Sequence, residues 1–165
     1  MTSEYQLRVG TTRDISFLKT MLYEAVFWNP ENKRIPVAEL FREPAIIKIL
    51  DHWGKRAGDF SMIATDAEHK PVGAAWYRFW TDDDHSYRYI DENTPEIGIA
   101  VLKEHRRKGL GSRLMTQVLK HAQKKGIKQI SLSVDPNNPA LTLYKDQAFK
   151  KVAEVSTSWT MVKIL

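Results

Sequence analysis

A basic turn with two glycines joins a strand pattern to a helix pattern in the segment EIGIAVLKEHRRKGLGSRLM, and this feature constrains the fold most. Before the turn, residues 96–102 form an apolar run rich in isoleucine and valine, which is typical of a buried strand. After it, Leu110, Leu114, Val118 and Ala122 recur on one face of a helix. The segment therefore predicts a strand that passes through a tight turn into an amphipathic helix.

This turn also predicts an anion site. The first N–H groups of a helix have no acceptor within the helix, and the helix dipole adds partial positive charge at the same end. Gly109 and Gly111 allow a ligand to approach the backbone closely. Arg106, Arg107 and Lys108 add formal charge. A pyrophosphate suits this arrangement, and a solvated basic turn before an ordinary helix is the alternative.

The rest of the chain predicts alternating strands and helices in one domain over residues 1–165. Strand patterns cover residues 5–9, 60–66, 72–80, 129–134, 150–155 and 158–164. Helical patterns cover residues 45–53, 139–147 and a stretch that Thr11 or Thr12 begins and that runs to about Val26. The order predicts an α/β fold, a mixed sheet with helices on its faces.

Composition excludes several kinds of site. The chain has no cysteine, which excludes disulfides, thiolate metal sites and cysteine nucleophiles. The five histidines show no metal-ligand spacing, so no metal is expected. No apolar run approaches the roughly 18 residues of a membrane span, and the polar N-terminus has no signal core. We expect a cytoplasmic protein that does not bind membranes.

The charge is distributed unevenly along the chain. Residues 1–100 hold 12 Lys/Arg and 16 Asp/Glu, whereas residues 101–165 hold 13 and 4. The second part therefore suits an anionic ligand, either a phosphorylated cofactor or a nucleic acid. Its basic residues lie at a glycine turn and a helix end, without a helix-turn-helix partner, so nucleic acid is not expected as a partner.

Two other phosphate motifs do not fit the glycine turn. A P-loop requires Gly-Lys-Ser/Thr, but Gly111 is followed by Ser112 and Arg113. A dinucleotide-binding fingerprint requires a third glycine, and Leu114 occupies that place. The nucleophile-elbow pattern GxSxG is also absent from the sequence.

Two segments in register resemble the GCN5-related N-acetyltransferase (GNAT) superfamily. Arg106-x-x-Gly109-x-Gly111 after the strand IGIAV resembles its acetyl-coenzyme A motif. LSVDPNNPALTLYKDQAF resembles its second cofactor segment, through Asn138, Ala140, Leu143, Tyr144 and Phe149. The segments lie a helix and a strand apart and together cover residues 96–150. One residue departs from the pattern: Ala148 occupies the place of the usual glycine.

The resemblance implies a fold, an activity and a cofactor. The fold is a mixed, mostly antiparallel sheet of about seven strands, splayed between the fourth and fifth and flanked by about four helices. The activity is transfer of an acetyl group from acetyl-coenzyme A to a primary amine by direct attack in a ternary complex. A non-catalytic acyl-coenzyme A sensor is the alternative. Many relatives are dimers, so the resemblance leaves a homodimer open.

The resemblance also assigns cofactor contacts along both segments. The backbone of residues 107–112 would hold the pyrophosphate, and the strand edge at residues 99–101 would pair with the pantetheine amides. Asn138 would hydrogen-bond the pantetheine arm, with Asn137 as a register alternative. The full set of expected cofactor contacts is Ile99, Ala100, Val101, Arg106, Arg107, Lys108, Gly109, Leu110, Gly111, Ser112, Asn137, Asn138 and Tyr144.

Two residues are expected to be catalytic. Tyr144 would stand near the sulfur and protonate the departing thiolate, since a phenol of pKa near 10 can donate to a thiolate whose conjugate acid has a pKa near 8.5. Its alternative reading is a core aromatic beside Leu141. Glu96 would act as the general base; its alternative reading is an exposed carboxylate at a strand end. The loop supplies weaker base candidates, which are His85, Asp91 and Glu92.

The loop before the glycine-turn strand bears on the acceptor. Between residues 81 and 96 lie six carboxylates, which are Asp82, Asp83, Asp84, Asp91, Glu92 and Glu96, with Tyr87 and Tyr89 between them. More aromatics lie upstream, at Trp28, Trp76, Tyr77 and Trp80. If the loop borders the acceptor mouth, it favours a small cationic amine or an exposed peptide amino group. A solvated acidic loop beside core aromatics is the alternative.

Overall fold

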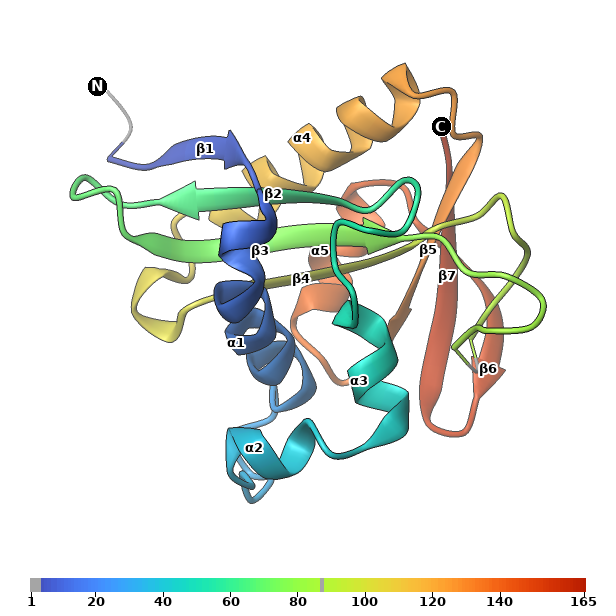
Figure 1. Ribbon diagram of the computed structural model, residues 1–165, viewed down its shortest axis with the longest axis horizontal. Helices are drawn as coiled ribbons and strands as arrows, with labels where there is room; N and C mark the ends of the chain where they lie inside the picture. Colours follow the sequence, from blue (N-terminus) through green and yellow to red (C-terminus); the bar gives the residue numbers. More distant parts are fainter. Residues whose placement is uncertain (1–3, 87) are drawn as a thin grey trace.

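The computed structural model describes residues 4–86 and 88–165, and its centre is a seven-stranded sheet in the order β1-β2-β3-β4-β5-β7-β6 (Figure 1). All neighbouring strands pair antiparallel except β4 and β5, which are parallel. The strands are β1 (Gln6–Val9), β2 (Phe60–Thr65), β3 (Pro71–Arg78), β4 (Glu96–Val101), β5 (Gln129–Val134), β6 (Lys150–Val155) and β7 (Ser158–Ile164). The predicted mixed, mostly antiparallel sheet is confirmed.

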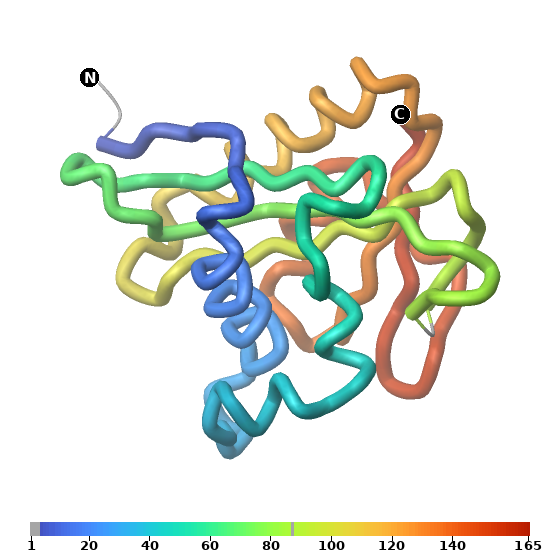
Figure 2. The backbone as a smooth tube through the Cα atoms, viewed as in Figure 1, coloured from blue at the N-terminus to red at the C-terminus, as the bar shows by residue number. Residues whose placement is uncertain are grey.

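Helices cover both faces of the sheet. They are α1 (Ile15–Val26), α2 (Val37–Leu40), α3 (Pro44–Leu50), α4 (Leu110–Lys124) and α5 (Ala140–Asp146), with short 3-10 turns η1 (Thr12–Asp14) and η2 (Lys103–His105). Figure 2 shows α1 and α3 crossing in front of the sheet and α4 passing behind it. Two hydrophobic cores result, one on each face.

The central strands are apolar throughout because both of their faces are buried. In β2, Met62 and Ala64 join the core on the α4 face, while Ile63 between them joins the core under α1. The predicted apolar stripe of α4 is confirmed: Leu114 and Val118 are both 0% exposed. Burying a side chain of this size contributes roughly 1.5–3 kcal/mol, so this stripe fixes α4 against β2 and β3.

Two predicted elements are shorter than expected. The strand predicted over residues 72–80 ends at Arg78, and Trp80 turns out of the sheet. The helix predicted over residues 45–53 ends at Leu50. Asp51 leaves the helix with a ψ of 139°, and positive φ angles of 52° at His52 and 85° at Gly54 follow it. The turn that replaces the helix brings Asp59 back to Gly54, whose N–H donates to Asp59 Oδ2 at 2.9 Å.

The sheet opens between β4 and β5, as predicted. In the described chain the two strands are in register at a single pair, Glu96 with Ser131. Next to it the Ser131 N–H donates to Pro95 O at 2.9 Å. Beyond this point β4 stays with β3 and β5 stays with β7, so the strands diverge. The edge of β4 that faces the gap therefore has backbone groups directed at whatever occupies it.

Candidate active site

The glycine turn has the geometry of an anion site. Arg107 and Gly109 have positive φ angles of 59° and 79°, which fold the chain sharply before α4 begins at Leu110. The Arg113 N–H donates to Gly109 O at 3.1 Å and begins the hydrogen bonding of the helix. The N–H groups that precede it lie at the positive end of the helix dipole. The predicted passage from strand through turn to helix is confirmed.

The basic side chains at this turn differ in the groups that they contact. Arg106 turns back: its Nε donates to Val101 O at 2.8 Å, and its Nη2 lies 3.5 Å from Glu24 Oε2 on α1. The Lys108 ammonium lies 5.8 Å from the centre of the Tyr5 ring. Arg106 therefore positions the turn against β4 and α1, while the Arg107 side chain is exposed to solvent.

Gly109 and Gly111 differ in the structural reason for having no side chain. A Cβ at Gly109 would meet nothing within 4 Å, so this glycine is required for its left-handed backbone. A Cβ at Gly111 would lie 3.4 Å from Leu143 Cδ2, in ordinary contact with α5. Leu110 is 2% exposed, so its side chain belongs to the core and its backbone is the part that a ligand can reach. The exposed Ser112 follows it on the first turn of α4.

The edge of β4 leads from the turn to a cavity. Ile99, Ala100 and Val101 are half-buried and pair with β3 on one side, with the gap toward β5 on the other. Gly98, one residue earlier, lines the cavity under the ring of Trp76. A Cβ at Gly98 would lie 2.5 Å from Trp76 Cζ2. This glycine is required because the indole needs its space.

We expect Gly98→Ala to lower the free energy of unfolding by roughly 1–3 kcal/mol, because the buried indole of Trp76 must move to admit the methyl group. Urea unfolding measures this difference. Gly111→Ala is the matched control: its Cβ makes an ordinary 3.4 Å contact, and alanine is the better helix former by up to about 1 kcal/mol. Equal stability of Gly98→Ala and the parent chain would contradict the interpretation.

The second cofactor segment forms a tight turn at the end of β5. Asn138 lines the cavity; its N–H donates to Asp135 O and its Oδ1 accepts from Ala140 N, both at 2.9 Å. Asn137 is exposed, and its N–H donates to Asp135 Oδ1 at 2.8 Å. Of the two register alternatives, Asn138 is the one that the structure brings to the cavity.

Tyr144 lies on α5 within the hydrophobic core that α4 covers, and the described residues that line the cavity do not include it. It is 8% exposed and its ring meets Phe149 edge to face, with centroids 6.1 Å apart. Burial raises the pKa of Tyr144 to about 12, so its hydroxyl stays protonated at neutral pH. The turn after α5 is closed by Ala148 with a φ of 66°, which explains why glycine suits this place and shows that alanine keeps the turn.

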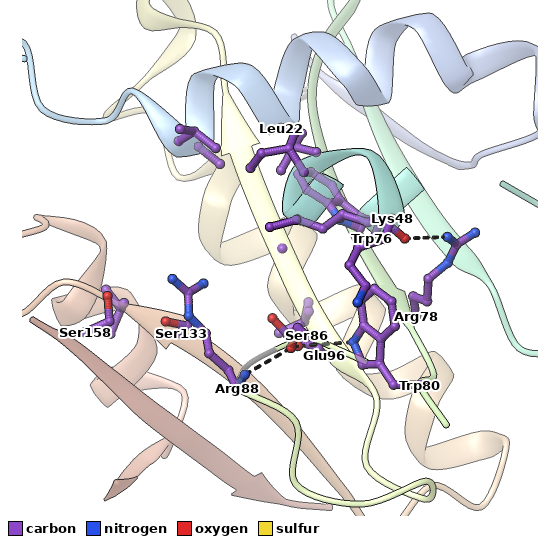
Figure 3. Close-up of a pocket in the computed structure, with 18 of the residues that line it drawn as sticks. Leu22, Lys48, Trp76, Arg78, Trp80, Ser86, Arg88, Glu96, Ser133 and Ser158 are labelled. Carbon is purple, nitrogen blue, oxygen red and sulfur yellow. Dashed lines mark hydrogen bonds between the residues drawn. The ribbon is translucent and has the colours of Figure 1, made fainter. Parts of the chain in front are cut away.

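The cavity encloses about 860 Å³ between the sheet opening, α1 and α3. Figure 3 shows its lining, to which β4 contributes Glu96, the loop contributes Ser86 and Arg88, and β5 and β7 contribute Ser133 and Ser158. Trp28, Trp76 and Trp80 also line it. Tyr77 does not: it lies in the core on the α4 face, where its Oη is hydrogen-bonded to His121 Nδ1 at 3.0 Å. Tyr77 thus agrees with the alternative reading as a core aromatic, because neighbouring strand residues face opposite sides of the sheet.

Glu96 is held in place at the cavity wall. Its Oε2 accepts from Trp80 Nε1 at 3.1 Å and from Ser86 Oγ at 2.6 Å. Among the weaker base candidates, His85 also lines the cavity. Asp91 accepts from Asn93 N and Thr94 Oγ1 within its own turn, and Glu92 accepts from Asp82 N. These contacts fix Glu96 at the cavity wall, and Asp135 after β5 is a second carboxylate in the lining.

Carboxylates of the acidic loop (residues 81–96) contact other side chains of the protein. Asp84 pairs with Lys48 at 3.3 Å and with Arg56 at 3.0 Å, and Asp82 accepts a hydrogen bond from the Tyr89 hydroxyl. Glu96 is the one loop carboxylate, among the described residues, that lines the cavity. Tyr87, which the sequence also pointed to, lies outside the described residues. Asp82 and Asp84 are thus engaged by other side chains, and Glu96 is the carboxylate that this loop segment brings to the cavity wall.

One wall of the cavity rests on a buried arginine that sequence reasoning missed. Arg78 is 1% exposed; it donates to both carboxylate oxygens of Asp59, at 2.9 and 2.8 Å. Its Nη1 donates to Asp51 Oδ1 and to Lys48 O, both at 3.0 Å. A lone arginine at the end of an apolar strand was the available signal, since a charge there requires a partner. Through Lys48 O, Arg78 fixes α3 to the end of β3.

Two further properties concern metals and membranes. Across residues 4–86 and 88–165, no three His, Asp or Glu side chains come together as a metal-binding group. None of the helices in this part of the chain combines the length and apolarity needed to cross a membrane.

Solved structures of similar fold include proteins with bound coenzyme A. The PaiA N-acetyltransferase of Thermoplasma acidophilum, in complex with coenzyme A, superposes with a TM-score of 0.71 at 18% identity, covering 99% of this chain and 100% of that one. A GNAT superfamily phosphinothricin acetyltransferase of Sinorhizobium meliloti, in complex with acetyl-coenzyme A, gives 0.69 at 16% identity, covering 99% and 89%. A GNAT-family acetyltransferase of Streptococcus pneumoniae gives 0.66 at 18% identity, covering 98% and 100%.

Sequence comparison gives the family directly. No curated protein matches the chain. The profile of the acetyltransferase (GNAT) family matches residues 22–149, which run from the last turn of α1 through the glycine turn to the end of the second cofactor segment. That match covers most of the chain and includes both segments on which the sequence interpretation depends. The chain belongs to the GNAT family of acetyltransferases.

Proposed function

We propose that this protein transfers an acetyl group from acetyl-coenzyme A to a primary amine, by direct attack within a ternary complex. The observation that carries the proposal is the opening between β4 and β5, since its β4 edge lies in the chain between the glycine turn and the cavity that Glu96 and Gly98 line. The structural neighbours that hold coenzyme A or acetyl-coenzyme A in the same fold support it.

The residues present fit the cofactor at both ends. The left-handed Gly109, with open space where a Cβ would stand, leaves the N–H groups of the first turn of α4 accessible to a diphosphate. The gap-facing edge of β4 from Ile99 to Val101 can pair with the pantetheine amides as a strand would. Asn138 stands across the gap at the end of β5.

Acetyl-coenzyme A supplies the activated thioester. Around it we assign three tasks to this chain. Glu96 accepts a proton from the acceptor ammonium, directly or through water. A backbone N–H on the gap-facing edge of β4 donates to the carbonyl oxygen as negative charge develops there. Tyr144 donates to the departing thiolate.

The raised pKa of Tyr144 determines how it helps. A phenol with a pKa of about 12 lies well above a thiol near 8.5, so complete proton transfer to a free thiolate is uphill. A hydrogen bond to the partial negative charge on sulfur requires no such transfer and is strongest where water is excluded. Burial thus keeps the donor protonated and strengthens the hydrogen bond that it gives. The proton follows as the thiol is released.

A pair of variants at Gly109 tests the cofactor site. Asparagine and aspartate both tolerate a left-handed backbone, so Gly109→Asn and Gly109→Asp should fold alike. They differ by one negative charge beside the expected diphosphate. We expect calorimetric titration with coenzyme A to show that Gly109→Asp binds at least about tenfold more weakly than Gly109→Asn.

Stability and turnover complete this test. An aspartate at the start of a helix favours the dipole, so Gly109→Asp should unfold no more easily than Gly109→Asn. Equal coenzyme A affinities would contradict a diphosphate at this turn. Release of free coenzyme A in the presence of varied amines then separates an enzyme from a module that binds acyl-coenzyme A without transferring it.

A further inference from the structure

Two hydrogen bonds hold Glu96 at the cavity wall, and both come from the chain between β3 and β4. Trp80, just before the acidic loop, donates from Nε1 to Glu96 Oε2 at 3.1 Å. Ser86, within the loop, donates from Oγ to the same oxygen at 2.6 Å. The Ser86 hydroxyl also accepts from the Arg88 N–H at 3.3 Å, so the loop backbone constrains its direction. Figure 3 shows both donors beside Glu96.

The chain that carries these two donors is attached to α3 and to the turn that follows α3. Asp84 pairs with Lys48 Nζ at 3.3 Å and with Arg56 Nη2 at 3.0 Å. Both cations also lie over the ring of Trp80, at 5.7 and 5.6 Å from its centre. Lys48 Nζ donates in addition to His85 O at 2.5 Å. The cations thus hold Trp80 directly, and they hold the two residues that come before the second donor.

The two hydrogen bonds leave half of the carboxylate for chemistry. Both end on Oε2 of Glu96, so neither of them occupies Oε1. A general base must lie within hydrogen-bond reach of the proton that it takes. A misplacement of about 1 Å can cost about 10²-fold in rate. A carboxylate that is fixed through one oxygen can present the other to an acceptor in constant geometry.

We propose that Ser86 is a positioning residue for Glu96, and that Asp84 holds Ser86 and Trp80 in place for this task by binding α3 and the turn after it. This inference rests on the proposed acetyl transfer, in which Glu96 accepts a proton from the acceptor ammonium. Ser86 itself exchanges no proton with the substrates and acts through Glu96. The acidic loop then has a role in catalysis that does not depend on attracting a cationic acceptor.

The first part of the test measures what the Ser86 hydroxyl contributes. Phenethylamine, isoamylamine, L-leucinamide and putrescine are offered with saturating acetyl-coenzyme A, and the amine that releases coenzyme A fastest is used throughout. We expect Ser86→Ala to lower kcat about tenfold. Its affinity for coenzyme A, measured by calorimetry, should stay within about twofold of the parent value. Ser86→Thr keeps the hydroxyl and should retain kcat within about threefold of the parent.

The second part is a double-mutant cycle with Glu96→Gln. Glutamine keeps the shape of the side chain but cannot take up the proton. In that background we expect Ser86→Ala to change kcat by less than about twofold, because no base is left to position. A general disturbance of the loop would instead cost about tenfold in both backgrounds.

Asp84 extends the test to a residue that does not contact Glu96. Its side chain is 50% exposed, and exposed ion pairs contribute little, so Asp84→Ala should lower kcat by about fivefold at most. This loss should also disappear in the Glu96→Gln background. Asp83→Ala is the matched control, because it removes the same charge from the neighbouring exposed residue. It should keep kcat within about twofold.

The outcomes separate this inference from the proposed function. A similar loss from Ser86→Ala in both backgrounds, or no loss in either, overturns the positioning role and leaves acetyl transfer standing. Parent-like turnover of Glu96→Gln does the same, because Glu96 is then not the base. Coenzyme A binding without acetylation of any of the four amines overturns the transfer and this inference with it, and so does an absence of coenzyme A binding by the parent chain.

Discussion

Tyr144→Phe is expected to lose about 10²-fold in kcat while binding coenzyme A as the parent chain does. The substitution removes one oxygen from a ring that is 8% exposed and packed on Phe149, so the core keeps its shape. The departing thiolate loses its hydrogen-bond donor in a site where water is a poor substitute. Steady-state release of coenzyme A gives kcat, and calorimetry gives the affinity.

Tyr77→Phe is a closely matched control for this change. Tyr77 is 1% exposed, belongs to the same core cluster as Tyr144, and burial raises its pKa to about 12. Its Oη is hydrogen-bonded to His121, and Tyr77→Phe removes the same single oxygen. It should retain kcat within about twofold, since its hydroxyl contacts His121 and no reacting atom. If Tyr144→Phe turned over as fast as Tyr77→Phe, Tyr144 would be a core aromatic with no part in the chemistry.

Arg78→Met is expected to lower the free energy of unfolding by about 3–5 kcal/mol, the largest effect on stability that we predict. The methionine leaves the Asp59 carboxylate, 1% exposed, without its guanidinium. It also frees Lys48 O, through which Arg78 fixes α3. Urea unfolding monitored by tryptophan fluorescence is a suitable measurement, because Trp53 lies 5.1 Å from the guanidinium.

Two further variants separate buried charge from ordinary ion pairing. Arg34 makes a two-pronged contact with Glu24 at 2.9 and 3.0 Å, but its side chain is 45% exposed. Arg34→Met should therefore cost less than about 1 kcal/mol. Combining Arg78→Met with Asp59→Leu should recover part of the loss, because no buried charge then lacks a partner. A loss below about 1 kcal/mol in Arg78→Met alone would show that the network contributes little.

The spacing of apolar residues and the positions of glycines predicted most strands and helices, because both depend on neighbouring residues in the chain. The stripe of Leu110, Leu114 and Val118 is buried as expected, and the glycine turn stands between β4 and α4. The end of α3 was missed because it depends on the extended backbone of Asp51 and the left-handed His52 and Gly54, which the apolar spacing of the segment does not reveal.

The site was less predictable because its wall is built from distant parts of the chain. The loop carboxylates suggested a cationic acceptor, but Lys48 and Arg56 bind Asp84, and these come from α3 and the turn after it. Arg88 counted only as the single arginine among many acids, and the fold places it in the wall of the cavity. Charge read along a sequence does not show which charges meet in space.

The single pair that joins β4 to β5 sets stability against activity in this protein. A few more backbone hydrogen bonds between β4 and β5 would join the two halves of the sheet into one continuous sheet and raise its melting temperature. The same bonds would close the gap in which we propose that the cofactor binds. Laboratory evolution for heat resistance alone would therefore select variants in which β4 and β5 pair along their length. We expect such variants to be more stable and to lack activity.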